Sequence, residues 1–401
     1  MPGFLTVTAQ AALQNVRAAA PLFMSGYSDL TMRNHVLLDM MEQFGNVEYN
    51  ADSVISCVWK ILVRKPKVRT FQNTTRKTFG DHNGLEELQV DVRGYENDDS
   101  LKELDYKRNQ GSTQLINLLE LKLKQMGQSM CENIVEGLYR DGNTTAYQDG
   151  YQGFESCLGA NNSARGGTDA DNDDAVILPS DSYGGHSTDL GYFGGTSTAE
   201  IASTSRMNQG QGADNDFPYG QADSQYDAMS PVLWNYNAER WGSGSNLWVD
   251  NNEDVVREAL NVLHNRTGIG PDARIAFLIA PDLYPGLENH FGDRFRIAQT
   301  ATGNHGFPEY QTLQIDGCSF KSDSGCPSGI GYGFVANHME FFNLGTMNGG
   351  GEKPMIDVFG PTWEDAMGAY IMRSSTFGNL RIQPKFVTKL ASLAHYNGQI
   401  A

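Results

Sequence analysis

Two short stretches of this chain have residue types that resemble ligand-binding loops. Residues 345–353, GTMNGGGEK, are rich in glycine like a phosphate-binding loop, but the sequence contains no Gly-x4-Gly-Lys-Ser/Thr and Pro354 follows the lysine. Residues 169–174, DADNDD, begin like an EF-hand calcium loop. Position six is Asp174 instead of glycine and position twelve is Ser180 instead of glutamate, so the EF-hand is excluded. An incidental surface cation at this stretch stays open as an alternative.

The other reactive residue types show no catalytic pattern. The eight histidines include no HExxH and no pairing with cysteines at zinc-site spacing, and no Gly-x-Ser-x-Gly elbow is present. A glycosidase needs two carboxylates at a defined separation, which a sequence does not show. We therefore predict no catalytic residue, no metal site and no cofactor. The alternative is a carbohydrate-binding or carbohydrate-active protein, suggested by the Gly-, Asn-, Asp- and Tyr-rich middle of the chain.

The composition describes a polar, acidic globular protein. The 401 residues carry a net charge of −18, which argues against a nucleic-acid reader with a basic face but not against a container for nucleic acid. The five cysteines are odd in number and spread along the chain, so we expect free thiols in a reducing compartment. The first residues, MPGFLTVTAQ, lack the features of a signal peptide, and no apolar run is long enough to span a membrane.

A long amphipathic helix is predicted at residues 112–139. Its apolar residues recur every three or four positions, from Leu115 through Met126 and Ile134 to Leu138, and so line one face. Ser112 can cap its first turn, and Asp141-Gly142 provides a stop just past the end. At 1.5 Å per residue the rod would be about 40 Å long, well above the usual helix length.

An extended hairpin is predicted before this helix. Strand-like runs at residues 54–63 and 88–93 flank a polar stretch. Residues 60–77 carry seven basic side chains and no acidic one, whereas residues 81–105 carry nine acidic side chains against two basic ones. The pattern fits either a solvated loop with uneven charge or a cationic arm that docks on the acidic body of another copy. The residues predicted to form this inter-subunit arm are Arg64, Lys65, Lys67, Arg69, Arg76 and Lys77.

The remaining elements predict an α+β fold without a regular βαβ repeat. A short helix can be capped by Ser28-Asp29 and ended by Gly45, and two more helices can begin at Asp250 and Asp282. The strand at residues 355–359 should close at Gly360-Pro361, and turn residues around Gly378 should separate the last two strands. The other predicted strands are residues 273–280, a hairpin at 313–317, 330–335, 339–344, 369–373 and 380–382.

The order of these elements resembles a known family. The motifs are Tyr-Arg-Asp-Gly at the end of the long helix, the strand-Pro-helix unit of residues 277–287, Leu-Gln-Ile-Asp-Gly at 313–317, and Phe-Gly-Asn-Leu at 377–380 followed by Pro384. Together with the basic hairpin they resemble the major capsid protein of tailed bacteriophages, which has the Hong Kong 97-type fold. The resemblance extends over most of the chain as an order of elements.

The resemblance implies a domain organisation. It implies an N-terminal arm at residues 1–50, an extended β-hairpin loop at 51–100, and a peripheral domain with a long spine helix at 101–159 and 355–401. The axial domain would be residues 250–354. Residues 160–249, an acidic Gly- and Asp-rich stretch, would be an insertion.

The resemblance also implies a function. The chain would be a structural subunit that self-assembles through hexamers and pentamers into the icosahedral head shell of a tailed phage enclosing double-stranded DNA. It would contact that DNA only non-specifically. Its partners would be further copies of itself, a scaffolding protein, the portal and possible decoration proteins, with no membrane. It would reside in the virion shell after assembly in the host cytoplasm.

Overall fold

The computed structural model divides the chain into two compact units. Unit 1 contains the described parts of Tyr95–Asn133 and Ile356–Thr376. Unit 2 contains those of His35–Gly94, Ile134–Met355 and Phe377–Ala401. The division into arm, loop, peripheral domain, insertion and axial domain stays a prediction. The residues that the structure describes are 36–49, 56–62, 85–108, 118–160, 175–177, 179–189, 229–238, 241, 247–267, 274–292, 313–315, 317–344 and 357–396.

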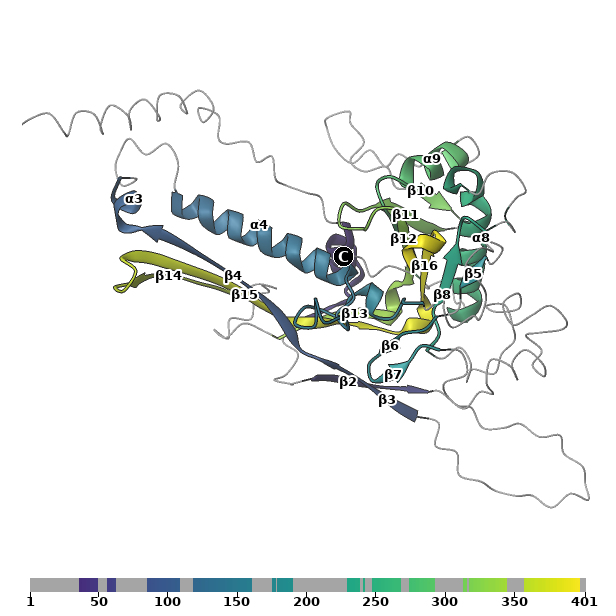
Figure 1. Ribbon diagram of the computed structural model, residues 1–401, viewed down its shortest axis with the longest axis horizontal. Coiled ribbons are helices and arrows are strands. Elements are labelled where there is room, and N and C mark those ends of the chain that lie inside the picture. Colours follow the sequence, from purple (N-terminus) through teal and green to yellow (C-terminus); the bar gives the residue numbers. More distant parts are fainter. Residues whose placement is uncertain are drawn as a thin grey trace, which may run out of the picture. The chain divides into compact units, whose positions relative to one another are not determined.

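Helices and strands alternate irregularly along the chain (Figure 1). The helices are α2 (Val36–Phe44), α3 (Glu103–Arg108), α4 (Leu118–Tyr139), α8 (Trp248–Thr267) and α9 (Tyr284–Gly292), with 3-10 turns η1 (Phe154–Ser156), η4 (Ala336–His338), η5 (Pro384–Phe386) and η6 (Leu393–Tyr396). The strands are β1 (Val47–Tyr49), β2 (Ser56–Leu62), β3 (Leu85–Asp91), β4 (Arg93–Lys102), β5 (Val176–Ile177), β6 (Ser182–Tyr183), β7 (His186–Ser187), β8 (Val232–Asn235), β9 (Ile275–Ile279), β10 (Leu313–Ile315), β11 (Cys318–Ser322), β12 (Ile330–Val335), β13 (Met339–Asn343), β14 (Asp357–Glu364), β15 (Ala369–Ile382) and β16 (Val387–Ala391).

In unit 1, the first part of α4 lies along one face of the strands β4, β14 and β15 (Figure 1). Both β4 and β14 pair with β15. Leu101, Met126 and Met372 form a buried cluster between the helix and the strands, and Tyr370 packs against it. These apolar side chains come from both layers, so their burial holds the helix on the sheet.

Unit 2 is built on a seven-stranded mixed sheet with the order β10-β11-β9-β12-β16-β8-β5. Helix α8 packs against β8, β12 and β16, and α9 packs against α8. The five residues of β9 are all buried, which explains why this strand reads as a continuous apolar run. Unit 2 also contains β1, β13 and residues 378–382 of β15, which pair in that order.

The helices predicted from apolar periodicity are confirmed where the structure describes them. In α4, Met126, Met130, Ile134 and Leu138 lie on the predicted stripe and are buried. Residues 112–117 and the Ser28-Asp29 cap lie outside the described residues. Helix α2 ends at Phe44, where Gly45 has a φ of +72° that favours glycine, as expected for a helix stop.

Two predicted chain breaks near the C-terminus are wrong. Strand β14 continues through Gly360-Pro361 to Glu364, because a register shift between Phe359 and Thr362 accommodates the proline that cannot donate a ladder hydrogen bond. The two strands expected around Gly378 are one strand, β15, since its first half pairs with β14 and its second half with β13. A Cβ atom at Gly378 would lie 2.3 Å from the Phe342 carbonyl oxygen. This glycine therefore permits close strand packing rather than a turn.

Asp323 is a fully buried carboxylate that joins three segments of unit 2. Its Oδ2 accepts hydrogen bonds from the Leu37 N–H at 3.0 Å and the Tyr139 hydroxyl at 2.8 Å. Its Oδ1 accepts the Gly325 N–H at 3.0 Å. Because Leu37 lies in the first turn of α2, the carboxylate also satisfies an otherwise unpaired helix N–H and complements the helix dipole.

The substitution Asp323→Ala should lower the free energy of unfolding of the full chain by about 3–5 kcal/mol, because it leaves buried donors unsatisfied. Urea denaturation of the unassembled chain measures this. The exposed Asp98 offers the control, and Asp98→Ala should change the value by less than about 0.5 kcal/mol. A loss below about 1 kcal/mol for Asp323→Ala would contradict the assigned role.

Candidate functional site

The described ends of the predicted hairpin form a two-stranded antiparallel ribbon, β2–β3. Seven residue pairs run from Ser56 opposite Asp91 to Leu62 opposite Leu85. Since side chains alternate between the faces of a strand, the ribbon has two distinct faces. We call Cys57, Trp59, Leu88 and Val90 its inner face. The outer face consists of Val58, Leu62 and Leu85, together with Lys60 and Glu87.

The inner face is buried against the β6–β7 turn of unit 2. Leu88 has no exposed surface, and the Trp59 ring lies 6.2 Å from the Tyr183 ring, centroid to centroid. Gly184 in this turn has a φ of +61°, and a Cβ atom there would lie 3.0 Å from the Leu88 Cβ. Glycine is therefore needed at this position both for the backbone conformation and for the space that Leu88 occupies.

Hydrogen bonds hold the ribbon to the body of unit 2. The Gln89 N–H donates to the Gly184 carbonyl at 3.2 Å, and the Asn379 side-chain amide donates to the Asp91 carbonyl at 2.8 Å. His186 Nε2 lies 2.8 Å from the Glu87 carbonyl oxygen. These bonds involve β3, so β3 is the attached strand of the pair.

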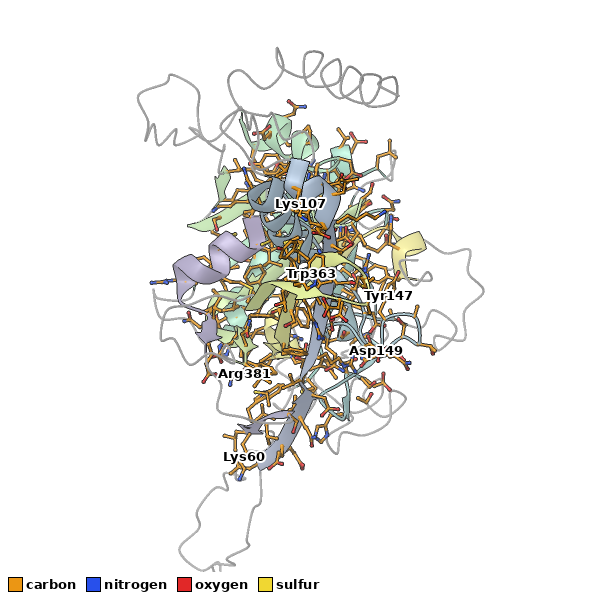
Figure 2. All side chains as sticks on the ribbon, turned by 90° about the vertical axis from the view of Figure 1, so that its left-hand side faces the viewer. Lys60, Lys107, Tyr147, Asp149, Trp363 and Arg381 are labelled. Carbon is orange, nitrogen blue, oxygen red and sulfur yellow. The ribbon has the colours of Figure 1, made fainter. Side chains whose placement is uncertain are left out.

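Arg381 supports the inner face from β15. Its guanidinium carbon lies 5.8 Å from the Trp59 ring centre, and it forms an ion pair with Glu340 at 2.6 Å. Figure 2 labels Arg381 and also Lys60, which lies on the outer face. Burial raises the pKa of Glu340, and the neighbouring Glu48 carboxylate raises it further. Burial also raises the pKa of the Cys57 thiol, which favours its protonated form.

The outer face carries apolar surface that the described chain does not cover. Val58 is 45% exposed, Leu62 is 61% exposed and Leu85 is 53% exposed. Leu62 and Leu85 are direct cross-strand partners, so they form one continuous patch. Lys60 and Glu87 face each other beside this patch. The arrangement suits contact with another apolar surface rather than covalent chemistry.

The six predicted arm residues, Arg64, Lys65, Lys67, Arg69, Arg76 and Lys77, lie outside the described residues, so their role stays a prediction. The apolar outer face was missed by the sequence analysis. A signal was present, because residues 58–62, Val-Trp-Lys-Ile-Leu, place apolar side chains on both faces of the strand instead of alternating with polar ones.

A second candidate in unit 2 is a polar cavity of about 370 Å³. Glu155 and Lys389 line it as a buried ion pair, with 2.7 Å between the Lys389 Nζ and the Glu155 carboxylate. The Tyr332 hydroxyl donates a hydrogen bond to the same carboxylate. Each buried charge thus has a partner, so this network is explained by the folding requirement for paired buried charges.

The described residues contain no group of three or more His, Cys, Asp or Glu side chains that could hold a metal ion. The calcium-loop-like stretch at 169–174 and the glycine-rich stretch at 345–353 lie outside the described residues. Within the described part, no helix is both long and apolar enough to cross a membrane. None of the five cysteines forms a disulfide bond within the chain.

Comparison with known proteins identifies the fold. No family model and no curated protein matches the sequence. Among solved structures, the chain is similar to the capsid asymmetric unit of Cyanophage A-1(L), with 10% identity and a TM-score of 0.54 over 91% of this chain and 94% of that one. The chain has the Hong Kong 97-type capsid fold.

A second solved structure supports the same fold. The capsid of a native GTA (gene transfer agent) particle, computed with C5 symmetry, has 8% identity and a TM-score of 0.52, covering 92% of this chain and 95% of that one. The α+β class and the capsid fold expected from the order of elements are therefore confirmed. Both structures are capsids, so the carbohydrate alternative gains no support.

Asp181 precedes the β6–β7 turn that supports the ribbon. Its two carboxylate oxygens accept the Ser182 N–H at 2.7 Å and the Gly159 N–H at 2.9 Å. Burial raises the pKa of Asp181 to about 7, and the nearby Asp141 and Glu155 carboxylates contribute to the rise. Because the pKa is higher in the folded than in the unfolded chain, the folded chain binds the proton more tightly between about pH 4 and 7.

We predict that Asp181 makes the folded chain less stable as the pH rises through this window. Its contribution to the free energy of unfolding should fall by roughly 2–4 kcal/mol between pH 4 and 7 and then level off. Urea denaturation of wild type and Asp181→Asn at several pH values isolates this term, because asparagine does not titrate. Parallel pH profiles for the two chains would refute the prediction.

Proposed function

We propose that this chain is the structural subunit that self-assembles into the icosahedral head shell of a tailed phage and encloses its double-stranded DNA. The observation that carries the proposal is the shared fold, which extends over nine tenths of this chain and of the capsid chains. Such a subunit needs self-complementary surfaces rather than a catalytic centre. The proposed location is the virion shell, after assembly in the host cytoplasm.

The β2–β3 ribbon would supply one such surface. Its inner face is fixed to unit 2, whereas Val58, Leu62 and Leu85 on the outer face are exposed. Fully burying one leucine side chain under another copy would contribute about 1.5–3 kcal/mol, so even part of this patch would matter for assembly. The attachment of β3 would hold the patch in one orientation before contact, which lowers the entropy cost of docking.

Electrostatics would then set the register between copies. The basic residues between positions 64 and 77 continue directly from β2, and the chain as a whole carries a charge of −18. Opposite charges steer docking and exclude wrong pairings more than they add affinity. A chain with this net negative charge would not bind packaged DNA tightly, since DNA is also negatively charged. A scaffolding protein, the portal and possible decoration proteins complete the proposed set of partners, together with hexamers and pentamers of the chain itself.

The direct test is negative-stain electron microscopy of the purified chain, with sedimentation velocity on the same sample. Closed shells, tubes or rings of capsomer size are expected. A lysate of the native source supplies any scaffolding partner. A chain that remains monomeric across salt and concentration, with and without that lysate, would contradict the proposal.

The double substitution Leu62→Asp, Leu85→Asp should abolish assembly while leaving the chain folded. Both side chains are more than half exposed, so their loss costs the monomer little, whereas two carboxylates in a buried contact are unfavourable. Circular dichroism checks the fold and sedimentation velocity measures assembly. Leu247, which is 60% exposed on unit 2, provides the matched control Leu247→Asp. Normal particles from the double variant would exclude the outer face as a contact.

The substitutions Arg64→Glu, Lys65→Glu, Lys67→Glu and Arg69→Glu should impair assembly, and lowering the salt concentration should not rescue it. The control exchanges arginine for lysine, and lysine for arginine, at the same four positions and keeps every charge. The control should assemble like wild type, as seen by sedimentation velocity. Wild-type particles from the charge-reversed chain would rule out the cationic-arm role.

A further inference from the structure

The cavity of about 370 Å³ in unit 2 has a buried side and a more exposed side. The Lys389–Glu155 ion pair lines the buried side, and these two side chains are only 2% and 10% exposed. Arg140 and Glu136 form a second ion pair in the wall at 2.7 Å, and their side chains are 38% and 41% exposed. Small-ligand sites usually have volumes of roughly 300–1,000 Å³. The cavity is therefore large enough for a small molecule, and its exposed side gives such a molecule access.

Two further carboxylates line the cavity, those of Asp141 and Asp181. Neither forms an ion pair within the part of the chain that the structure describes, and their hydrogen bonds come from uncharged donors. The two cations of the wall, Arg140 and Lys389, are already paired with glutamates. The wall thus carries four carboxylates against two permanently charged cations, which leaves an excess of two negative charges.

This charge distribution selects the class of ligand. An excess of negative charge excludes an anion. Among the described residues, no group of three or more His, Cys, Asp or Glu side chains could hold a metal ion. An ammonium group needs less, because it can form a charge-assisted hydrogen bond with a single carboxylate. Tyr147 and Tyr396 also line the cavity and offer aromatic rings for a short methylene chain.

We propose that this cavity binds a small aliphatic diamine, whose two ammonium groups pair with the carboxylates of Asp141 and Asp181. A diamine brings two positive charges, so it balances the excess negative charge of the wall. The inference goes beyond the proposed function and does not depend on it, since every residue of the cavity wall belongs to one chain.

Protons would compete with this ligand for the two carboxylates. Burial raises the pKa of Asp141, although Lys389 partly offsets the rise, and burial raises the pKa of Asp181 to about 7. A protonated carboxyl group cannot pair with an ammonium group, so binding should weaken as the pH falls. The Tyr139 and Tyr396 hydroxyls stay neutral, because burial raises the pKa of both well above the usual value.

Equilibrium dialysis of the unassembled full chain with labelled putrescine, a four-carbon diamine, tests the site. We expect one saturable site per chain in the millimolar range or tighter, measured at about 0.15 M salt to screen the charge of the whole chain. Unlabelled butylamine has a single ammonium group and should compete about tenfold more weakly than unlabelled putrescine. Uncharged butanediol should not compete. The absence of saturable binding would overturn the proposal, as would equal competition by butylamine or by Mg²⁺. This series uses the wild-type chain only, so it does not depend on how a variant folds.

Matched substitutions locate the bound ligand. Asp141→Asn and Asp181→Asn each remove one charge with little change of shape, and each should weaken putrescine binding about tenfold or more. The control is Asp149→Asn, because Asp149 is exposed, does not line the cavity and belongs to the same segment as Asp141 (Figure 2). Circular dichroism checks the fold of all three variants. Equal weakening by Asp149→Asn would show general attraction to an acidic chain and would overturn the site.

A pH profile tests the pairing with Asp181. The affinity of the wild-type chain for putrescine should fall about tenfold between about pH 8 and pH 6. His395 also lines the cavity, with its Nδ1 2.7 Å from the Ser392 hydroxyl oxygen. The variant His395→Gln should keep the same fall in affinity, because it leaves Asp181 in place. A flat profile for the wild-type chain, or for His395→Gln, would overturn the pairing with Asp181.

Discussion

A two-stranded β ribbon has two faces, and the described part of this chain covers only one face of β2–β3. An isolated hairpin is marginal in water, so the buried inner face is what keeps the ribbon ordered. Leu88 and Trp59 supply that burial against the β6–β7 turn, and the Asn379 amide and Gly184 carbonyl satisfy backbone groups of β3. The outer leucines face solvent because a ribbon that is attached through one face exposes its other face.

Unit 2 also contains a network of buried polar groups. Tyr332 and Tyr139 lie 5.5 Å apart between ring centroids, and each donates its hydroxyl to a different buried carboxylate, Glu155 or Asp323. The Glu155–Lys389 pair gains little net energy over an apolar pair of the same shape. The hydrogen bonds of a buried carboxylate depend on direction, so they allow few alternative arrangements of the side chains around it. The network joins the end of α4 and η1 to β12, β16 and the segment that follows β11.

Local sequence patterns predict most helices and strands. They do not predict an element whose structure depends on a partner far away in the sequence. The stripe of α4 and the apolar run of β9 depend on near neighbours, and both were predicted from the sequence. The Gly-Asn pair at 378–379 resembles a turn locally, yet it lies inside β15 because β13 provides a strand beside it. The Asn379 side chain bonds to Asp91, 288 positions away, and no short motif can reveal such a partner.

The candidate surfaces were predictable only in part for the same reason. The charge asymmetry of residues 60–105 is visible in the sequence, and so is the two-faced apolar run at 58–62. Which of those apolar residues remain exposed is decided by the β6–β7 turn, which lies more than 120 positions later in the chain. Helix α3, Glu-Leu-Asp-Tyr-Lys-Arg, is too short for periodicity to identify.

A ribbon whose outer face docks on a different surface of the next copy makes a heterologous contact, which closes into a ring when the rotation permits. A single ring does not enclose a volume, so a closed shell needs at least one further contact that joins one ring to the next. The outer face of β2–β3 therefore accounts for only one of the contacts that the proposed shell requires.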